Sequence, residues 1–128
     1  MLERLYIEAT ETTPRVFFDK EESKFIISGR SLPEDTESVY EPIMDWLNEF
    51  EQDPNPEIEF EINFDYYNST SLKKVVDILV ILKRIETEKN SKVVVVWYYE
   101  DGDESSYENG EDLCYAVDLP IKLKVREE

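Results

Sequence analysis

The sequence predicts an α/β domain in which a mixed sheet of about five to six strands carries helices mainly on one face. Residues 57–65 alternate polar and apolar side chains, which is typical of a strand with one buried face. Apolar residues then recur at helical spacing from Leu72 to Leu82, and residues 92–99 form an apolar run. A strand, a helix and a second strand in this order favour parallel pairing through a right-handed crossover. Because one face of 57–65 is strictly polar, we expect the helices to cover mainly the other face.

Upstream of this unit, the pattern predicts three strands and one helix. The first strand is expected at residues 2–9, and residues 16–19 and 24–29 are expected to form a hairpin around a polar turn. Ser38 with Glu41 matches a capping box and predicts the start of the helix. Its expected apolar face consists of Val39, Ile43, Met44, Trp46, Leu47 and Phe50.

The second half of the chain predicts two helices and three strands. The strand at 57–65 leads into a helix over 71–88, and the apolar run at 92–99 is typical of a strand covered on both faces. A short helix over 105–116 and a last strand near 119–125 follow. The predicted order is β-β-β-α-β-α-β-α-β. Since no repeat or linker is evident, residues 1–128 are expected to form a single domain.

Charge and cysteine content limit the classes of partner and compartment. The chain has 31 acidic and 14 basic residues and a net charge of −17, which disfavours nucleic acid and anionic membranes and favours basic protein partners. No apolar stretch approaches the ~18 residues of a membrane helix, and no signal-peptide pattern opens the chain. With Cys114 as the one cysteine, we expect a cytoplasmic protein in which this thiol is a packing residue.

The sequence offers little support for catalysis or metal binding. It contains no histidine, which removes the usual general base and the commonest metal ligand. The acidic stretch 101–112 differs from a calcium loop, because Ser106 and Asp112 occupy the positions of the required Gly and Glu. We therefore expect no enzyme, no metal and no cofactor. An acidic metal-dependent enzyme is the least favoured alternative.

A second acidic feature runs along the strand at 57–65. Glu57, Glu59, Glu61 and Asp65 resemble paired catalytic carboxylates, but an exposed sheet face explains their spacing. The same row of carboxylates is also suited to attract a basic partner.

The polar run from Asn68 to Ser71 is the strongest functional candidate. It places three hydroxyl groups where the strand should end and the helix begin. Free backbone N–H groups and the helix dipole favour an anion at such a point, so a phosphate attached there would be stabilised. Helix capping explains one such residue equally well, because Asn, Ser and Thr are preferred N-caps.

The helix predicted over 71–88 has an apolar arc wider than a surface helix needs. Ile78, Ile81 and Ile85, together with Val80, extend the arc beyond the core stripe. Two explanations are open: a neighbouring helix covers the excess, or these residues form a surface that binds a partner helix. We take Ile78, Ile81 and Ile85 as the candidate partner-binding surface.

Several segments together match a known family in order and spacing over nearly the whole chain. They are Thr10 with Thr13-Pro14, Gly29-Arg30-Ser31-Leu32-Pro33-Glu34, Pro42 with Trp46-Leu47, Tyr66-Tyr67-Asn68-Ser69-Thr70-Ser71 with Lys73, Trp97-Tyr98-Tyr99-Glu100, Gly110-Glu111-Asp112 and Leu119-Pro120. On these segments the chain resembles the SiaC-type regulatory phosphoproteins. The resemblance implies a fold related to STAS domains and to bacterial anti-sigma-factor antagonists.

The resemblance also implies a function. In that family a threonine directly after the asparagine is phosphorylated by a partner kinase, and a PP2C-type phosphatase reverses the modification. The unmodified form binds and activates a diguanylate cyclase, so the switch controls cyclic-di-GMP signalling. The expected function is thus a non-catalytic regulatory adaptor. The alternative is a constitutive protein-interaction or assembly module that is never phosphorylated.

The family's acceptor falls on Ser69 in this sequence, a departure from threonine that keeps the hydroxyl. Thr70 is the second candidate acceptor. The residues expected to support the phosphate are Asn68, Ser71, Lys73 and Lys74.

Overall fold

A computed structural model of the chain describes residues 2–126, and the order of its elements is the predicted one. The strands are β1 (Leu5–Ile7), β2 (Arg15–Asp19), β3 (Lys24–Ser31), β4 (Glu57–Tyr67), β5 (Lys92–Tyr99) and β6 (Ile121–Val125). The helices are α1 (Thr36–Phe50), α2 (Ser69–Lys89) and α3 (Glu104–Val117). The strand predicted at 2–9 is shorter than expected, whereas β5 has the predicted bounds.

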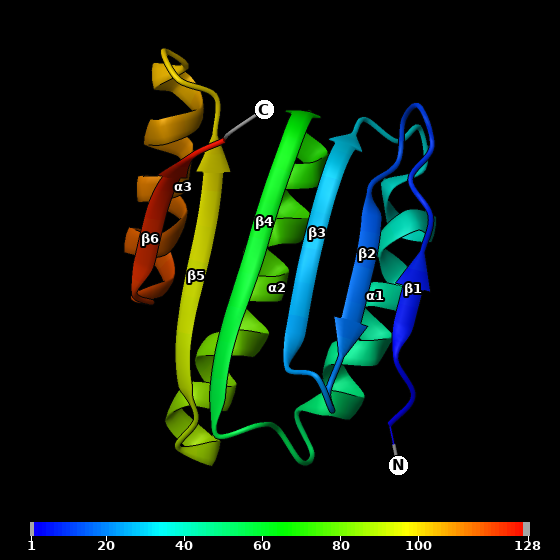
Figure 1. Cartoon of the computed structure of the whole chain (residues 1–128), viewed down its shortest axis with the longest axis vertical. Helices are drawn as coiled ribbons and strands as arrows, with labels where there is room; N and C mark the ends of the chain where they lie inside the picture. The colour runs from blue at the N-terminus through cyan, green and yellow to red at the C-terminus, as the bar shows by residue number, and fades with distance from the viewer. Residues whose placement is uncertain (1, 127–128) are drawn as a thin grey trace.

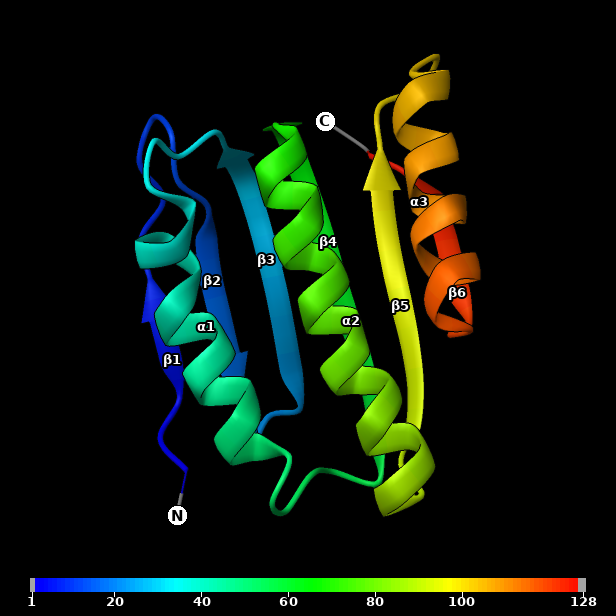
Figure 2. The same ribbon diagram turned by 180° about the vertical axis from the view of Figure 1, so that it is seen from behind.

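The strands form a mixed sheet with the order β1-β2-β3-β4-β5-β6. β1, β2 and β3 pair antiparallel, and β3, β4, β5 and β6 pair parallel. All three helices lie against one face of the sheet, with α2 between α1 and α3 (Figures 1 and 2). The predicted fold class and the one-sided helix layer are confirmed.

The main core lies between the sheet and the helices. Ile58, Phe60 and Ile62 of β4 point into it and are at most 2% exposed, whereas the alternating Glu57 and Glu59 are exposed on the helix-free face. This arrangement follows from the period-2 alternation that the sequence shows. Because β3, β4 and β5 run parallel, the loops after them gather at one end of the sheet, and the start of α2 lies there (Figure 2).

Two local predictions are wrong. The N-cap of α1 is Asp35, whose side chain accepts a hydrogen bond from the Ser38 N–H, so Ser38 lies inside the helix. β5 carries helices on one face only. Val96 is nevertheless fully buried on the other face, where its neighbours in register are Glu61 and Lys122. The apolar run therefore reflects burial within the sheet surface as well as under helices.

Candidate functional site

The start of α2 is built on the amide side chain of Asn68. Asn68 has extended backbone angles (φ −108°, ψ 175°) and is the N-cap, so α2 begins at Ser69, two residues earlier than predicted. Its Oδ1 accepts the Ser71 N–H at 2.9 Å. This bond satisfies one of the N–H groups that lack an intrahelical acceptor and leaves the preceding ones in the first turn available.

The three hydroxyl groups of this turn lie in different environments. Ser69 is exposed, and no hydrogen bond to its Oγ is found among the described residues. Thr70 is also exposed, but its Oγ1 donates to Asn68 Oδ1 at 3.0 Å and lies 2.9 Å from Thr36 Oγ1 on α1. Ser71 is completely buried. Of the two exposed hydroxyl groups, that of Ser69 is the one without a hydrogen bond within residues 2–126.

Ser71 belongs to a buried chain of hydroxyl groups that joins three elements. Its Oγ donates to the Ser31 carbonyl at 2.8 Å, which leaves it to accept from the Ser31 hydroxyl at 2.7 Å. Ser31 Oγ in turn lies 2.6 Å from the Tyr40 hydroxyl, which must be the donor. Burial raises the pKa of Tyr40 above its usual value, although the bonds to Ser31 and Ser71 act in the opposite direction. These hydrogen-bonded hydroxyl groups hold α1, β3 and α2 together next to the start of α2.

Replacing Ser71 with alanine is expected to lower the free energy of unfolding by about 1–3 kcal/mol, because one of the two buried hydroxyl protons of Ser31 and Tyr40 then has no acceptor. Urea unfolding measures the change. Ser105→Ala serves as the matched control, since Ser105 is exposed in the first turn of α3 and should change stability by less than about 0.5 kcal/mol. Equal stabilities for the two variants would contradict the stabilising role assigned to the buried hydroxyl groups of Ser31, Tyr40 and Ser71.

The two lysines predicted to support a phosphate differ in availability. Lys74 pairs with Glu37 of α1 at 2.7 Å and approaches Asp77 at 3.9 Å, so its charge is already used between the helices. Lys73 follows Ser69 by four residues, which places it on the same side of α2 one turn later. It is exposed and has no ion pair with any residue in the described range. Of these two lysines, Lys73 is thus the one available to a group on Ser69.

The charge at the start of α2 differs from that of the other two helices. α1 begins with Asp35 as N-cap and Glu37 in its first turn, and α3 begins with Asp103 and Glu104. α2 instead has the neutral Asn68 and no acidic residue in its first turn. In a chain with 31 acidic residues, this is the helix start whose own N-cap and first turn carry no negative charge.

The predicted partner-binding surface on α2 is wrong. Ile78, Ile81 and Ile85 are 0%, 5% and 0% exposed and belong to the hydrophobic core. Their burial follows from the position of α2 between α1 and α3, so the neighbouring-helix explanation of the wide apolar arc is the correct one. Of the residues in that arc, Val80 is the exposed one, at 46%.

Other features give no support for catalysis. Cys114 is 3% exposed, and burial raises the pKa of its thiol to about 11, so the thiol stays protonated at neutral pH. No group of three or more potential metal-ligating side chains lies within residues 2–126. In the same range, no helix has the length and apolar character needed to cross a membrane.

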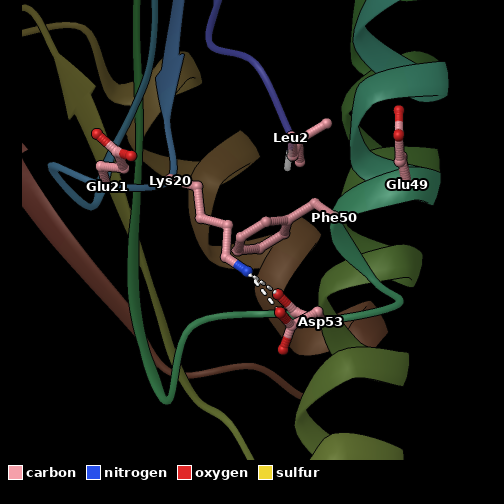
Figure 3. A pocket seen from close by; sticks show the side chains of 6 residues that line it. All are labelled: Leu2, Lys20, Glu21, Glu49, Phe50 and Asp53. Atoms are coloured by element: carbon pink, nitrogen blue, oxygen red, sulfur yellow. Dashed lines mark hydrogen bonds and ion pairs between the residues drawn. The ribbon is translucent and has the colours of Figure 1, made fainter.

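A surface depression lies at the other end of the sheet from Ser69, beside the β2–β3 turn (Figure 3). It is lined by Leu2, Lys20, Glu21, Glu49, Phe50 and Asp53. Lys20 Nζ donates to both the backbone carbonyl and Oδ2 of Asp53, at 2.5 and 3.0 Å. Because its one cation is paired within the depression, we assign it no ligand.

Comparison with known proteins decides the family. A family model described as SiaC family regulatory phosphoprotein matches residues 7–126. The chain belongs to the SiaC family. An uncharacterized protein of Pseudomonas aeruginosa (strain UCBPP-PA14) is 25% identical over 124 residues, which cover 97% of this chain and 98% of that protein.

Solved structures of SiaC from Pseudomonas aeruginosa share the fold of this SiaC-family chain. The apo-SiaC crystal structure has a TM-score of 0.84 and 24% identity, over 95% of this chain and 98% of that one. SiaC in the crystal structure of diguanylate cyclase SiaD with its activator SiaC has a TM-score of 0.86 and 24% identity, over 95% and 99%. The family model describes this family as one of regulatory phosphoproteins, and the resemblance seen in the sequence is confirmed.

Sequence reasoning missed Thr36 and the charge pattern of the helix starts. Thr36 is 34 residues from Thr70, so no local pattern links their hydroxyl groups. The contrast between Asn68 and the aspartates Asp35 and Asp103 was readable in the sequence. Its significance depends on knowing that these three residues are the N-caps of α1, α2 and α3.

Proposed function

We propose that this SiaC-family protein is a non-catalytic adaptor whose binding to a diguanylate cyclase is switched by reversible phosphorylation of Ser69. Membership of a regulatory phosphoprotein family supports a phosphate switch. The description of Pseudomonas aeruginosa SiaC as the activator of the diguanylate cyclase SiaD supports the class of partner. The observation that carries the proposal is the start of α2, where an exposed Ser69 hydroxyl precedes a first turn without acidic residues.

In the phosphorylation reaction this protein supplies only the hydroxyl group that is modified. Ser69 Oγ attacks the terminal phosphorus of a nucleoside triphosphate held by the kinase. A new O–P bond forms as the bond from that phosphorus to the bridging oxygen of the leaving diphosphate breaks, and a base on the kinase takes the hydroxyl proton. In reverse, a PP2C-type phosphatase directs water at the phosphorus, which restores the hydroxyl and releases inorganic phosphate.

The domain is suited to accept this phosphate without unfolding. A phosphate adds about 1.5–2 negative charges and three acceptor oxygens, and the free N–H groups of the first turn favour it. Lys73 supplies an unpaired positive charge one turn away. Ser71 follows Ser69 by two residues, about 200° around the helix axis, so a group on Ser69 points away from the buried hydroxyl groups of Ser71, Ser31 and Tyr40.

A partner that contacts the start of α2 would respond strongly to the modification. The phosphate would either repel negative charges on the partner or become buried in the interface without a counter-ion. Either outcome weakens the complex. The alternative, a constitutive interaction module, relied on the apolar arc of α2, whose isoleucines are buried.

Phosphate mapping in the native host tests the proposal. Tandem mass spectrometry of the chain recovered from host cells should find a phosphate on Ser69. Its occupancy should rise when the host's PP2C-type phosphatase gene is deleted and should vanish in Ser69→Ala. A chain without phosphate at residues 69–71 in both strains would contradict the switch.

A further inference from the structure

We infer that Thr36 of α1 selects the phosphorylated residue, because it engages the Thr70 hydroxyl and leaves Ser69 as the acceptor. The inference rests on the proposed phosphorylation switch and adds the residue that decides which hydroxyl reacts. It concerns two adjacent exposed hydroxyl groups that the local residue pattern does not distinguish.

The hydrogen bonds around Thr70 have a defined direction. A threonine hydroxyl has one proton and two acceptor lone pairs. Thr70 gives its proton to Asn68 Oδ1 at 3.0 Å, so the proton on the 2.9 Å contact with Thr36 Oγ1 must come from Thr36. The Thr70 oxygen is therefore both donor and acceptor in fixed bonds. Ser69 Oγ has neither kind of bond among the described residues.

These bonds work against phosphoryl transfer to Thr70. To react, the Thr70 oxygen would have to direct a lone pair at the terminal phosphorus of the nucleoside triphosphate and release its proton to the kinase base. Release of the proton requires Thr70 to break its bond to Asn68. The bond accepted from Thr36 occupies one of the two lone pairs of the Thr70 oxygen and holds that oxygen against α1, which hinders its approach to the phosphorus. Ser69 makes the same new O–P bond and loses the same proton without breaking either contact.

Electrostatics adds to the preference. Thr36 lies between Asp35 and Glu37 in the first residues of α1. A phosphate on Thr70 would be attached to an oxygen now 2.9 Å from the Thr36 hydroxyl, beside this acidic segment. Asp35 and Glu37 line the same surface depression as Thr70, and their like charge disfavours a phosphate there. Ser69 precedes Thr70 by one residue, about 100° around the helix axis, and is not bonded to α1.

Site-resolved phosphate mapping of Thr36 variants tests the inference. The full chain is produced in its native host as wild type, Thr36→Val, which keeps the shape but removes the hydroxyl, and Thr36→Ser, which retains it. Tandem mass spectrometry measures the ratio of phosphate on Thr70 to phosphate on Ser69. We expect Thr36→Val to raise this ratio by about two- to tenfold, as one lost hydrogen bond would. Thr36→Ser should keep the wild-type ratio.

Two further arms separate acceptor selection from a general effect on the fold. Thr87→Val removes a hydroxyl of α2 that bonds only its own helix carbonyls, at Lys83 and Arg84, and should leave the ratio unchanged. In a Ser69→Ala background, phosphate on Thr70 should appear mainly when Thr36 is also valine.

The outcomes distinguish the two proposals. If Ser69 is phosphorylated but the ratio of phosphate on Thr70 to phosphate on Ser69 is the same in Thr36→Val as in the wild type, the role of Thr36 is overturned. The phosphorylation switch itself is then still supported. Phosphate mainly on Thr70 in the wild type would also overturn the role of Thr36. Absence of phosphate from residues 69–71 in every variant would contradict the switch itself.

Discussion

Ser69→Asp is expected to weaken binding to the host's diguanylate cyclase by about tenfold or more, which corresponds to about 1.4 kcal/mol. The substitution places a permanent negative charge at the one helix start that lacks acidic residues. The helix dipole accommodates this charge within the domain, so the loss should fall on the complex rather than on folding. Isothermal titration calorimetry measures the affinity, and a urea unfolding curve verifies the fold.

Ser105→Asp is the matched control for this result. Ser105 is an exposed serine in the first turn of α3, one position further from its N-cap than Ser69, so the same charge enters the first turn of another helix. We expect wild-type affinity for Ser105→Asp and also for the uncharged variant Ser69→Ala. If Ser69→Asp bound as tightly as these two, a charge-gated interface at Ser69 would be ruled out.

Trp97→Ala is expected to lower the free energy of unfolding by about 3–5 kcal/mol, a large part of the 5–15 kcal/mol typical of a domain. Trp97 is 1% exposed, and its ring contacts Phe64 and Tyr67 edge-on at centroid distances of 6.3 and 5.7 Å. Its indole N–H donates to the Ser106 carbonyl at 3.0 Å, which ties α3 to β5. Alanine would lose this bond and leave a cavity under α3. Urea unfolding measures the loss.

Tyr115→Ala is the control for the Trp97 result. Tyr115 is an aromatic residue of α3 that is 90% exposed, so its removal should change stability by less than about 0.5 kcal/mol. Gly110→Ala tests the packing of α3 against Trp97 by changing the residue on α3. A Cβ at Gly110 would lie 2.6 Å from Trp97 Cδ1. We expect this substitution to destabilise by about 1–3 kcal/mol despite the better helix propensity of alanine. A stabilising Gly110→Ala would contradict the close packing of α3 on Trp97.

Local periodicity predicted the order of the elements and the single helix layer, but not the start of α1 or the covering of β5. The alternation along β4 reflects a physical fact of strands, in which successive side chains face opposite sides. It identified Ile58, Phe60 and Ile62 as core and the glutamates between them as solvent-facing. The order of strands and helices then led to a mixed sheet with one helix layer.

Predictions failed where the deciding contact is not local. The wide apolar arc of α2 was predictable, but whether Ile78, Ile81 and Ile85 face a neighbouring helix or a partner depends on where α1 and α3 pack. The capping box at Ser38 failed for a different reason. Asp35 three residues earlier offers an equally good side-chain acceptor, and helix α1 begins there.

The candidate site was predictable as a position but not in its detail. Three hydroxyl groups in a row indicated the segment, and the family resemblance selected Ser69. The structure separates them by environment, with Ser71 buried, Thr70 bonded to α1 and Ser69 exposed. These differences arise from Ser31, Thr36 and Tyr40, which are distant in sequence and whose roles appear only in three dimensions.

The most direct measurement of the proposed switch compares the chain with and without phosphate on Ser69. Phosphoserine is placed at residue 69 during synthesis, and the affinity for the host's diguanylate cyclase and the cyclase activity are measured for both forms. We predict that the unmodified chain binds and activates the cyclase. The phosphorylated chain should bind at least about tenfold more weakly, and a PP2C-type phosphatase should restore binding. Equal affinity and equal activation by the two forms would contradict the account.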